Sequence, residues 1–367
     1  MVATLSGAFG SSTYTLDFQG KSVAYQMAKS LIPILDSEYS SAVLYDPNNK
    51  VPHAGALIVG DAVYSNIIKT GGFGAIVVEN NGIAGIDTLW GAGNQAILAG
   101  DSGIAFWSKT GNDTIIAGGG NNAIYLGADG GSSQIYTGNG NDTIHTSNGN
   151  VSVDAGAGMN HIWLGDGADR ETVSGNDTIH LGGGYDTITV VGNGSAVVHG
   201  AATAVGGYTL TFIGGSNSST VMAGAGSYSI NGGAGGGVFY GGANGYNSIV
   251  AGTGAATIYG AGYGDTLLGG AGNDLIVAAT GNETLGGGAG VNVFNFTKAV
   301  DSNYTITDFG AAGSTDVMQI TRDQGSFAYV LNHYQVTAGG DLVHLRDGTT
   351  ILLQGYTAAL TASDFKH

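Results

Sequence analysis

The chain has 367 residues, of which 69 are glycine, 3 are proline and none is cysteine, so neither a disulfide nor a thiolate-bound metal can form. Only 10 residues are Lys or Arg against 27 Asp or Glu, and the formal net charge of −17 makes cations expected partners and nucleic acid an unexpected one. So much glycine with so little proline and no period of three excludes a collagen-like helix.

Residues 1–70 differ in pattern from the rest of the chain. An alternating segment at 13–18 predicts a strand, and residues 21–35 place apolar side chains at helical spacing. Pro33 is expected to kink or end this helix, which is the only helix the sequence predicts. We interpret residues 1–70 as a cap over the first coil of a repeat array, with an oligomerisation or anchoring element as the alternative.

The start of the chain carries no pattern typical of a secretion signal. Residues 1–19 have neither a basic segment nor a continuous apolar one, so a cleaved N-terminal signal is not predicted. No apolar run in the sequence reaches the roughly 18 residues of a membrane-spanning helix, so no transmembrane segment is expected.

From about residue 71 the chain repeats every nine residues. The best-preserved unit, Gly269–Val277, reads Gly-Gly-Ala-Gly-Asn-Asp-Leu-Ile-Val and matches the pattern Gly-Gly-x-Gly-x-Asp-x-apolar-x in full. The glycines permit a tight turn, the sixth-position aspartate offers an oxygen to calcium, and the eighth residue belongs to a short strand and points inward. Residues at the eighth position are apolar throughout the assigned units: Ile97, Phe106, Ile115, Ile124, Ile135, Ile144, Val153, Ile162, Ile179, Ile188, Val197, Val221, Ile230, Phe239, Ile249, Ile258, Leu267, Ile276, Leu285 and Phe294.

The repeats divide into two predicted solenoid blocks. The first covers residues 71–198, the second covers 214–295, and the interruption at 199–213 contains one longer strand. Two nonapeptides are expected to make one coil, with coils stacked at the strand spacing of about 4.8 Å. Residues 296–367 lack the period and predict antiparallel strands at 304–309, 342–345 and 349–353, the last two joined by a hairpin turn at Asp347-Gly348.

The repeats and the end of the chain together resemble the repeats-in-toxin (RTX) family of proteins exported by type I secretion. The C-terminal segments that carry the resemblance are Ile306–Phe309, Gly339–Leu345, Asp347–Ile351 and Leu360–Phe365. The resemblance implies an all-β fold, a right-handed parallel β-roll or β-solenoid, with a β-rich secretion module over residues 296–367. It further implies secretion to the cell surface or extracellular space by type I secretion machinery that reads an uncleaved C-terminal signal, and folding triggered there by Ca²⁺.

The chain departs from the family pattern because most of its repeats lack the sixth-position aspartate. The fold is therefore expected to rest on apolar stacking and backbone ladders, with calcium only in patches. Calcium in a β-roll lies between turns on one edge, so each nonapeptide is expected to pair with the next but one, and oxygens from two coils would help supply the six to eight ligands that calcium prefers. Three pairs are predicted as calcium sites: Asp169 with Asp186, Asp265 with Glu283, and Asp274 with Asn292. Poorer candidates, which could instead cap turns by hydrogen bonds, are Asp113, Asp142 and Asp177.

The ninth position predicts an outward column of aromatic and imidazole rings. Taking every second nonapeptide gives Trp107, Tyr125, His145, Trp163 and His180 in the first block, and Met222, Tyr240, Tyr259 and Val277 in the second. Large exposed apolar columns usually mark a contact, here with sugar rings or with another copy of the protein. Two alternatives are that another segment covers the column, or that the stacked side chains only stabilise the solenoid.

No catalytic constellation stands out in the sequence. Neither Gly-x-Ser-x-Gly nor His-Glu-x-x-His occurs, and the eight histidines are scattered. The favoured function is a secreted, calcium-binding structural protein, a rod-like solenoid that self-assembles as a surface layer, filament or biofilm-matrix component. The alternative is a solenoid that binds or acts on an extracellular polysaccharide, as a lyase or epimerase would, through the aromatic column.

Overall fold

The structure of the chain is a computed structural model that describes residues 2–7, 10–17, 42–44, 56–59, 68–70, 74–78, 87–101, 103–127, 131–201, 209–297, 300–311 and 314–367. The chain divides into two compact units, Met1–Gly184 and Tyr185–His367. The predicted helix at 21–35 lies outside the described residues. The strand predicted at 13–18 is confirmed within β2 (Gly10–Asp17), which pairs antiparallel with β1 (Val2–Gly7).

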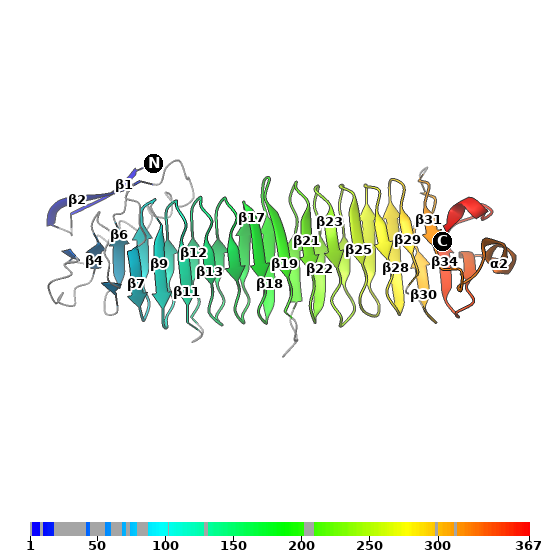
Figure 1. Cartoon of the computed structure of the whole chain (residues 1–367), viewed down its shortest axis with the longest axis horizontal. Helices are drawn as coiled ribbons and strands as arrows, with labels where there is room; N and C mark the ends of the chain where they lie inside the picture. Colours follow the sequence, from blue (N-terminus) through cyan, green and yellow to red (C-terminus); the bar gives the residue numbers. More distant parts are fainter. Residues whose placement is uncertain are drawn as a thin grey trace. The chain divides into compact units, whose positions relative to one another are not determined.

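The described coils of the first unit run through two parallel sheets, and from β4 onward successive strands alternate between them (Figure 1). One sheet holds β3 (Ala42–Leu44), β4 (Ala56–Val59), β6 (Ala75–Val78), β8 (Ala96–Ala99), β10 (Thr114–Ile116), β12 (Gln134–Tyr136), β14 (Ser152–Asp154) and β16 (Arg170–Val173). The other holds β5 (Ile68–Lys69), β7 (Asp87–Gly91), β9 (Ile104–Ser108), β11 (Ala123–Leu126), β13 (Thr143–His145), β15 (His161–Trp163) and β17 (Asn176–His180).

The second unit repeats this alternation and ends in a short antiparallel segment (Figure 1). Its first sheet holds β18 (Tyr185–Val190), β20 (Thr209–Ile213), β22 (Ser227–Asn231), β24 (Ser248–Val250), β26 (Thr266–Gly270), β28 (Asn282–Gly288), β30 (Asn303–Ile306) and β34 (Thr350–Gln354). Its second holds β19 (Ser195–His199), β21 (Ser219–Met222), β23 (Gly237–Tyr240), β25 (Ala256–Tyr259), β27 (Leu275–Val277), β29 (Val293–Asn295), β31 (Val317–Gln319) and β35 (Phe365–Lys366). The fold is thus an all-β parallel β-solenoid.

The eighth-position side chains fill the core, as predicted. Ile258 pairs with Ile276, and Ile97 pairs with Ile115, so residues 18 apart lie on neighbouring strands and two nonapeptides make one coil. Each of these four side chains is fully buried. The strands are short and β-branched residues recur in them, which suits side chains stacked on like side chains in successive coils.

One eighth-position assignment is wrong. Val197 is 38% exposed, whereas its neighbour Val198 is fully buried and pairs with Val221. Because side chains alternate across a strand, a slip of one residue in the assigned repeat exchanges the inward and outward faces. The longer strand predicted within 199–213 is β20, where Phe212 pairs with Ile188 and Ile230, so this strand belongs to the parallel sheet of the solenoid.

The C-terminal segment differs in part from the prediction. The strand predicted over 304–309 is β30, which is shorter and runs parallel to β28 and β34 instead of antiparallel, because Tyr304 and Ile306 face the core in register with Glu283 and Leu285. The antiparallel pair at 342–353 is confirmed as β33 (Gly340–His344) with β34, followed outward by β32 (Gln335–Thr337). The sequence did not predict the helix α2 (Phe327–His333), whose N-cap Ser326 accepts a hydrogen bond from the Tyr329 N–H.

Candidate calcium-binding turns

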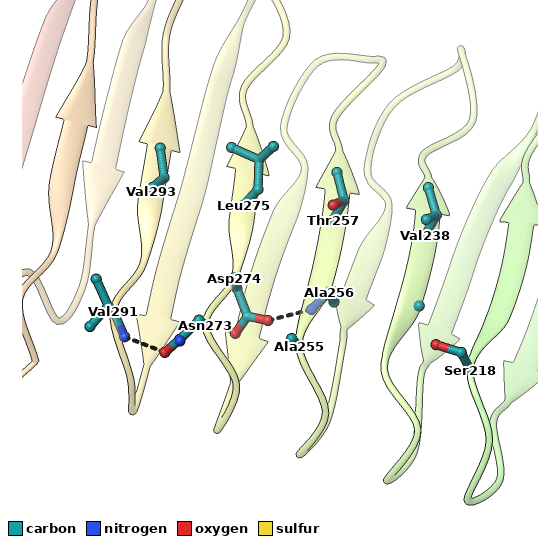
Figure 2. A pocket seen from close by; sticks show the side chains of 11 residues that line it. Ser218, Val238, Ala255, Ala256, Thr257, Asn273, Asp274, Leu275, Val291 and Val293 are labelled. Atoms are coloured by element: carbon teal, nitrogen blue, oxygen red, sulfur yellow. Dashed lines mark hydrogen bonds between the residues drawn. The ribbon is translucent and has the colours of Figure 1, made fainter. Parts of the chain in front are cut away.

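An Asn-Asp pair in the best-preserved nonapeptide connects three successive coils (Figure 2). The Oδ1 atom of Asp274 accepts the backbone N–H of Ala256 in the preceding coil at 2.8 Å. The Oδ1 atom of Asn273 accepts the backbone N–H of Val291 in the following coil, also at 2.8 Å. The fifth residue of the repeat therefore bonds to the following coil and the sixth residue to the preceding coil. Both accept from turn N–H groups that have no partner in the hydrogen-bond ladders of the strands.

The same arrangement recurs in the first unit. Asp113 Oδ1 accepts the N–H of Gln95 in the preceding coil at 3.0 Å, and Asn112 Oδ1 accepts the N–H of Ser132 in the following coil at 2.6 Å. Asn141 and Asp142 repeat it. The Asn-Asp dipeptide thus links adjacent coils through side-chain to backbone hydrogen bonds. Asp113 and Asp142 do cap turn N–H groups, as the alternative interpretation of these residues predicted.

The glycine at the first position of the repeat makes room for the aspartate. A Cβ atom built on Gly269 would lie 2.3 Å from Oδ2 of Asp274, because the carboxylate folds back over its own turn. The Gly-Gly-x-Gly-x-Asp pattern is therefore a packing requirement of the turn as well as a ligand pattern.

Several sixth-position carboxylates keep one oxygen without a hydrogen bond. Asp113, Asp177 and Asp274 are each about 2% exposed, and the Oδ2 atom of each is buried without a partner. Burial raises the pKa of Asp274 to about 6 and that of Asp177 to about 7, and it raises the pKa of Asp113. A buried carboxylate oxygen without a donor is costly to keep, and a bound cation would satisfy it.

These oxygens fit calcium. It is a hard cation that takes carboxylate and main-chain carbonyl oxygens, and the turns around each aspartate supply carbonyls. Asp113, Asp177 and Asp274 are thus the residues that would hold it, and calcium bound there would neutralise the buried charge and join adjacent coils. Asp274 also lines a groove of about 480 Å³ outside β23, β25, β27 and β29 (Figure 2).

Two other carboxylates in the second unit accept hydrogen bonds with both of their oxygens. Asp265 accepts four bonds: Oδ1 from the backbone N–H and the side-chain amide of Asn247, both at 2.8 Å, and Oδ2 from the N–H groups of Ala261 and Gly262 at 3.2 and 3.3 Å. Glu283 accepts only the Ala279 N–H with its two oxygens. Burial, opposed by this hydrogen bond and reinforced by the charge of Asp265, raises the pKa of Glu283 to about 8.

The remaining predicted ligands are buried at sixth positions. Asn292 accepts the Asp274 N–H at 3.0 Å, so this predicted pair does lie together. Asp169 accepts the Val151 N–H at 2.7 Å, and burial raises its pKa to about 6. Asp186 is 2% exposed and lies in the second unit, whereas Asp169 lies in the first, so calcium shared by these two stays a prediction.

A buried glutamate in the first unit was missed by the repeat pattern. Glu171 pairs with Val153 in the adjacent strand and so occupies an eighth position, yet it carries a carboxyl group. The side chain is 2% exposed, and both of its carboxyl oxygens are buried without a hydrogen bond. Burial, reinforced by the charges of Asp177, Asp154 and Asp169, raises the pKa of Glu171 well above its usual range. The sequence signal that could have revealed this glutamate is the shortened repeat unit at residues 164–171, which has eight residues instead of nine.

The predicted ring column of the first unit is a continuous stack. Ring centroids of successive members are separated by 5.3, 4.8, 4.2 and 5.2 Å, with interplanar angles of 4–18°, and the members are Trp107, Tyr125, His145, Trp163 and His180. In the second unit Tyr240 stacks on Tyr259 at 4.4 Å. The ring faces are therefore in contact with neighbouring rings, and the stack stabilises the coils by roughly 0.5–1.5 kcal/mol per pair. Burial lowers the pKa of His145.

Comparison with known proteins agrees with this geometry. The family profile of the RTX calcium-binding nonapeptide repeat matches four segments of the chain, residues 107–131, 136–171, 173–189 and 259–294. The chain carries RTX nonapeptide repeats. These RTX segments contain Asp113, Asp142, Asp177, Asp265 and Asp274, and RTX repeats are calcium-binding motifs. No curated protein matches the chain.

Within the described residues, no group of three or more His, Cys, Asp or Glu side chains is arranged to hold a metal ion. No helix among the described elements is long and apolar enough to cross a membrane.

Proposed function

We propose that this protein is a secreted, calcium-binding structural protein whose RTX solenoid self-assembles on the cell surface or in the extracellular matrix. The observation that carries the calcium part is the buried, unbonded Oδ2 atom of Asp274 in a full RTX nonapeptide. Bound calcium would neutralise such carboxylates and hold neighbouring turns together, so the folded solenoid would persist where calcium is abundant.

Support for assembly comes from the composition of the outward surface. The chain has few charged residues for its size, at 10%, and the second unit exposes Ile213, Tyr240 and Val250 on its strands. Outward apolar side chains on the strands of both sheets suit contact with a second copy of the chain. Export by type I secretion machinery rests on the C-terminal resemblance described above.

Carbohydrate binding through the ring column has less support. A sugar stacks on the face of an aromatic ring, and the faces within the column Trp107–His180 are taken up by neighbouring rings. The stacked faces are therefore not available to a sugar ring within this column, which disfavours carbohydrate binding there.

Electron microscopy of the purified full chain tests the assembly. The proposal expects ordered fibres or sheets with millimolar calcium and their loss after chelation. Monodisperse single particles at all calcium concentrations, together with binding or cleavage of an acidic polysaccharide, would overturn it.

A further inference from the structure

A sixth-position asparagine of the second unit donates its side-chain amide to the aspartate one coil further on. Asn247 is 1% exposed, and its side-chain nitrogen donates to Asp265 Oδ1 and to the main-chain oxygen of Gly242, at 2.8 and 2.9 Å. One carboxylate oxygen and one turn carbonyl are the kinds of oxygen that bind calcium. The amide thus supplies positively polarised hydrogens where an ion would supply charge.

The rest of the Asn247 side chain fixes this orientation. Its Oδ1 atom accepts the N–H groups of Tyr228 and Gly242, both at 3.0 Å, so its nitrogen must face the carboxylate. Asp265 in turn has both oxygens bonded, Oδ2 by two N–H groups of its own turn. No oxygen of this carboxylate is left for a metal.

Asn292 and Asp316 repeat the arrangement in the other sheet, directly before β29 and β31. Asn292 donates its amide to Asp316 Oδ1 at 3.0 Å, and Asp316 Oδ2 accepts the Gly310 N–H at 2.9 Å and the Ser314 hydroxyl at 3.0 Å. In both pairs the amide comes from the residue one coil nearer the N-terminus. Asp274 lacks such a donor, because Ala256 occupies that position.

We propose that an asparagine one coil before a sixth-position aspartate replaces calcium where the Oδ2 atom of that aspartate is also hydrogen-bonded, as in Asp265 and Asp316. Asp265 and Asp316 then hold adjacent coils together without metal. Asp274 requires the metal, because Ala256 stands where an asparagine would be one coil earlier. In the first unit, Asp177 accepts the amide of Asn160 but keeps its Oδ2 atom unbonded, so the asparagine alone does not replace the metal there. The inference rests on the proposed calcium function for Asp274 only, since the amide-locked turns are defined by their own hydrogen bonds.

The sharpest variant converts an amide-locked turn into a calcium turn. Asn247→Asp removes both amide hydrogens and leaves two carboxylates and the Gly242 carbonyl facing one another. In chelator we expect the unfolding temperature to fall by roughly 10 °C, because like charges are buried together. Calcium should restore it, and calorimetry on the full chain should find one more bound calcium than in the wild type. Asn231→Asp is the matched control, since Asn231 is exposed and its Oδ1 acceptor is kept.

A second pair of variants keeps the test decisive if Asn247→Asp does not fold. Asp265→Asn should leave the calcium stoichiometry of the wild type unchanged, whereas Asp274→Asn should lower it by one. Loss of one calcium in Asp265→Asn, or no gain in folded Asn247→Asp, would overturn the proposal. A wild type that binds no calcium would refute the proposed function instead, and the gain of a site in Asn247→Asp would still test the replacement.

Discussion

Replacing Glu171 should stabilise the protein, whereas replacing a buried side chain usually lowers the free energy of unfolding. The side chain lies in the apolar column beside Val153, and neither carboxyl oxygen has a hydrogen bond. An unsatisfied buried polar group costs about 1–3 kcal/mol, and an aliphatic side chain buried in its place contributes about 1.5 kcal/mol or more. Glu171→Val should therefore raise the free energy of unfolding by about 2–4 kcal/mol.

The pH dependence gives this prediction a second readout. The pKa of Glu171 is raised in the folded state, so the folded protein binds this proton more tightly than the unfolded chain does. The stability that results is fully present below the unfolded pKa of 4.5, and the free energy of unfolding falls as the pH rises towards the folded pKa. Glu171→Gln removes the proton exchange but keeps the shape, so it should gain stability over the wild type between pH 5 and pH 8 and little below pH 4.5.

Thermal unfolding in chelator between pH 4 and pH 8 measures both effects. A gain of 2–4 kcal/mol corresponds to a rise in unfolding temperature of roughly 4–16 °C in a unit of this size. A Glu171→Val variant that is less stable than the wild type at every pH would refute the reasoning, since it would mean that Glu171 has a stabilising partner.

Three further predictions concern the repeat. Ile276→Ala should lower the free energy of unfolding by about 2–5 kcal/mol, measured by denaturant titration, because Ile276 is fully buried, whereas a change of 1 kcal/mol or less would mean that the column is not the core. Gly269→Ala should weaken calcium binding and lower the unfolding temperature, because its Cβ would collide with Asp274 Oδ2, and wild-type behaviour in calorimetry would exclude that geometry. Calcium affinity at the Asp274 turn should rise as the pH increases from 5 to 7, since its carboxyl must lose a proton near pH 6, and a flat profile would contradict this.

The apolar column could be predicted from the sequence because it depends only on period. Every coil needs one inward residue at a fixed spacing, so Ile276 and its equivalents could be assigned without three-dimensional information. The assignments failed where the period changed. A slip of one residue misplaced Val197, and a unit of eight residues hid Glu171.

The chemistry of the turns could be predicted only in part. The aspartates were found from the motif, but their hydrogen bonds depend on which way each side chain leans along the stack. Asp274 bonds to the preceding coil and Asn273 to the following one, a direction that no single repeat encodes. The four donors around Asp265 likewise come from two separate coils, so its difference from Asp274 emerges only in the folded structure.

Calcium titration of the wild-type chain, followed by thermal unfolding, tests the central claim most directly. The account predicts that calcium binds the chelated protein and raises its unfolding temperature, and that Asp274→Asn removes part of that rise. An unfolding temperature that is the same in chelator and in millimolar calcium, with no heat of binding, would contradict it.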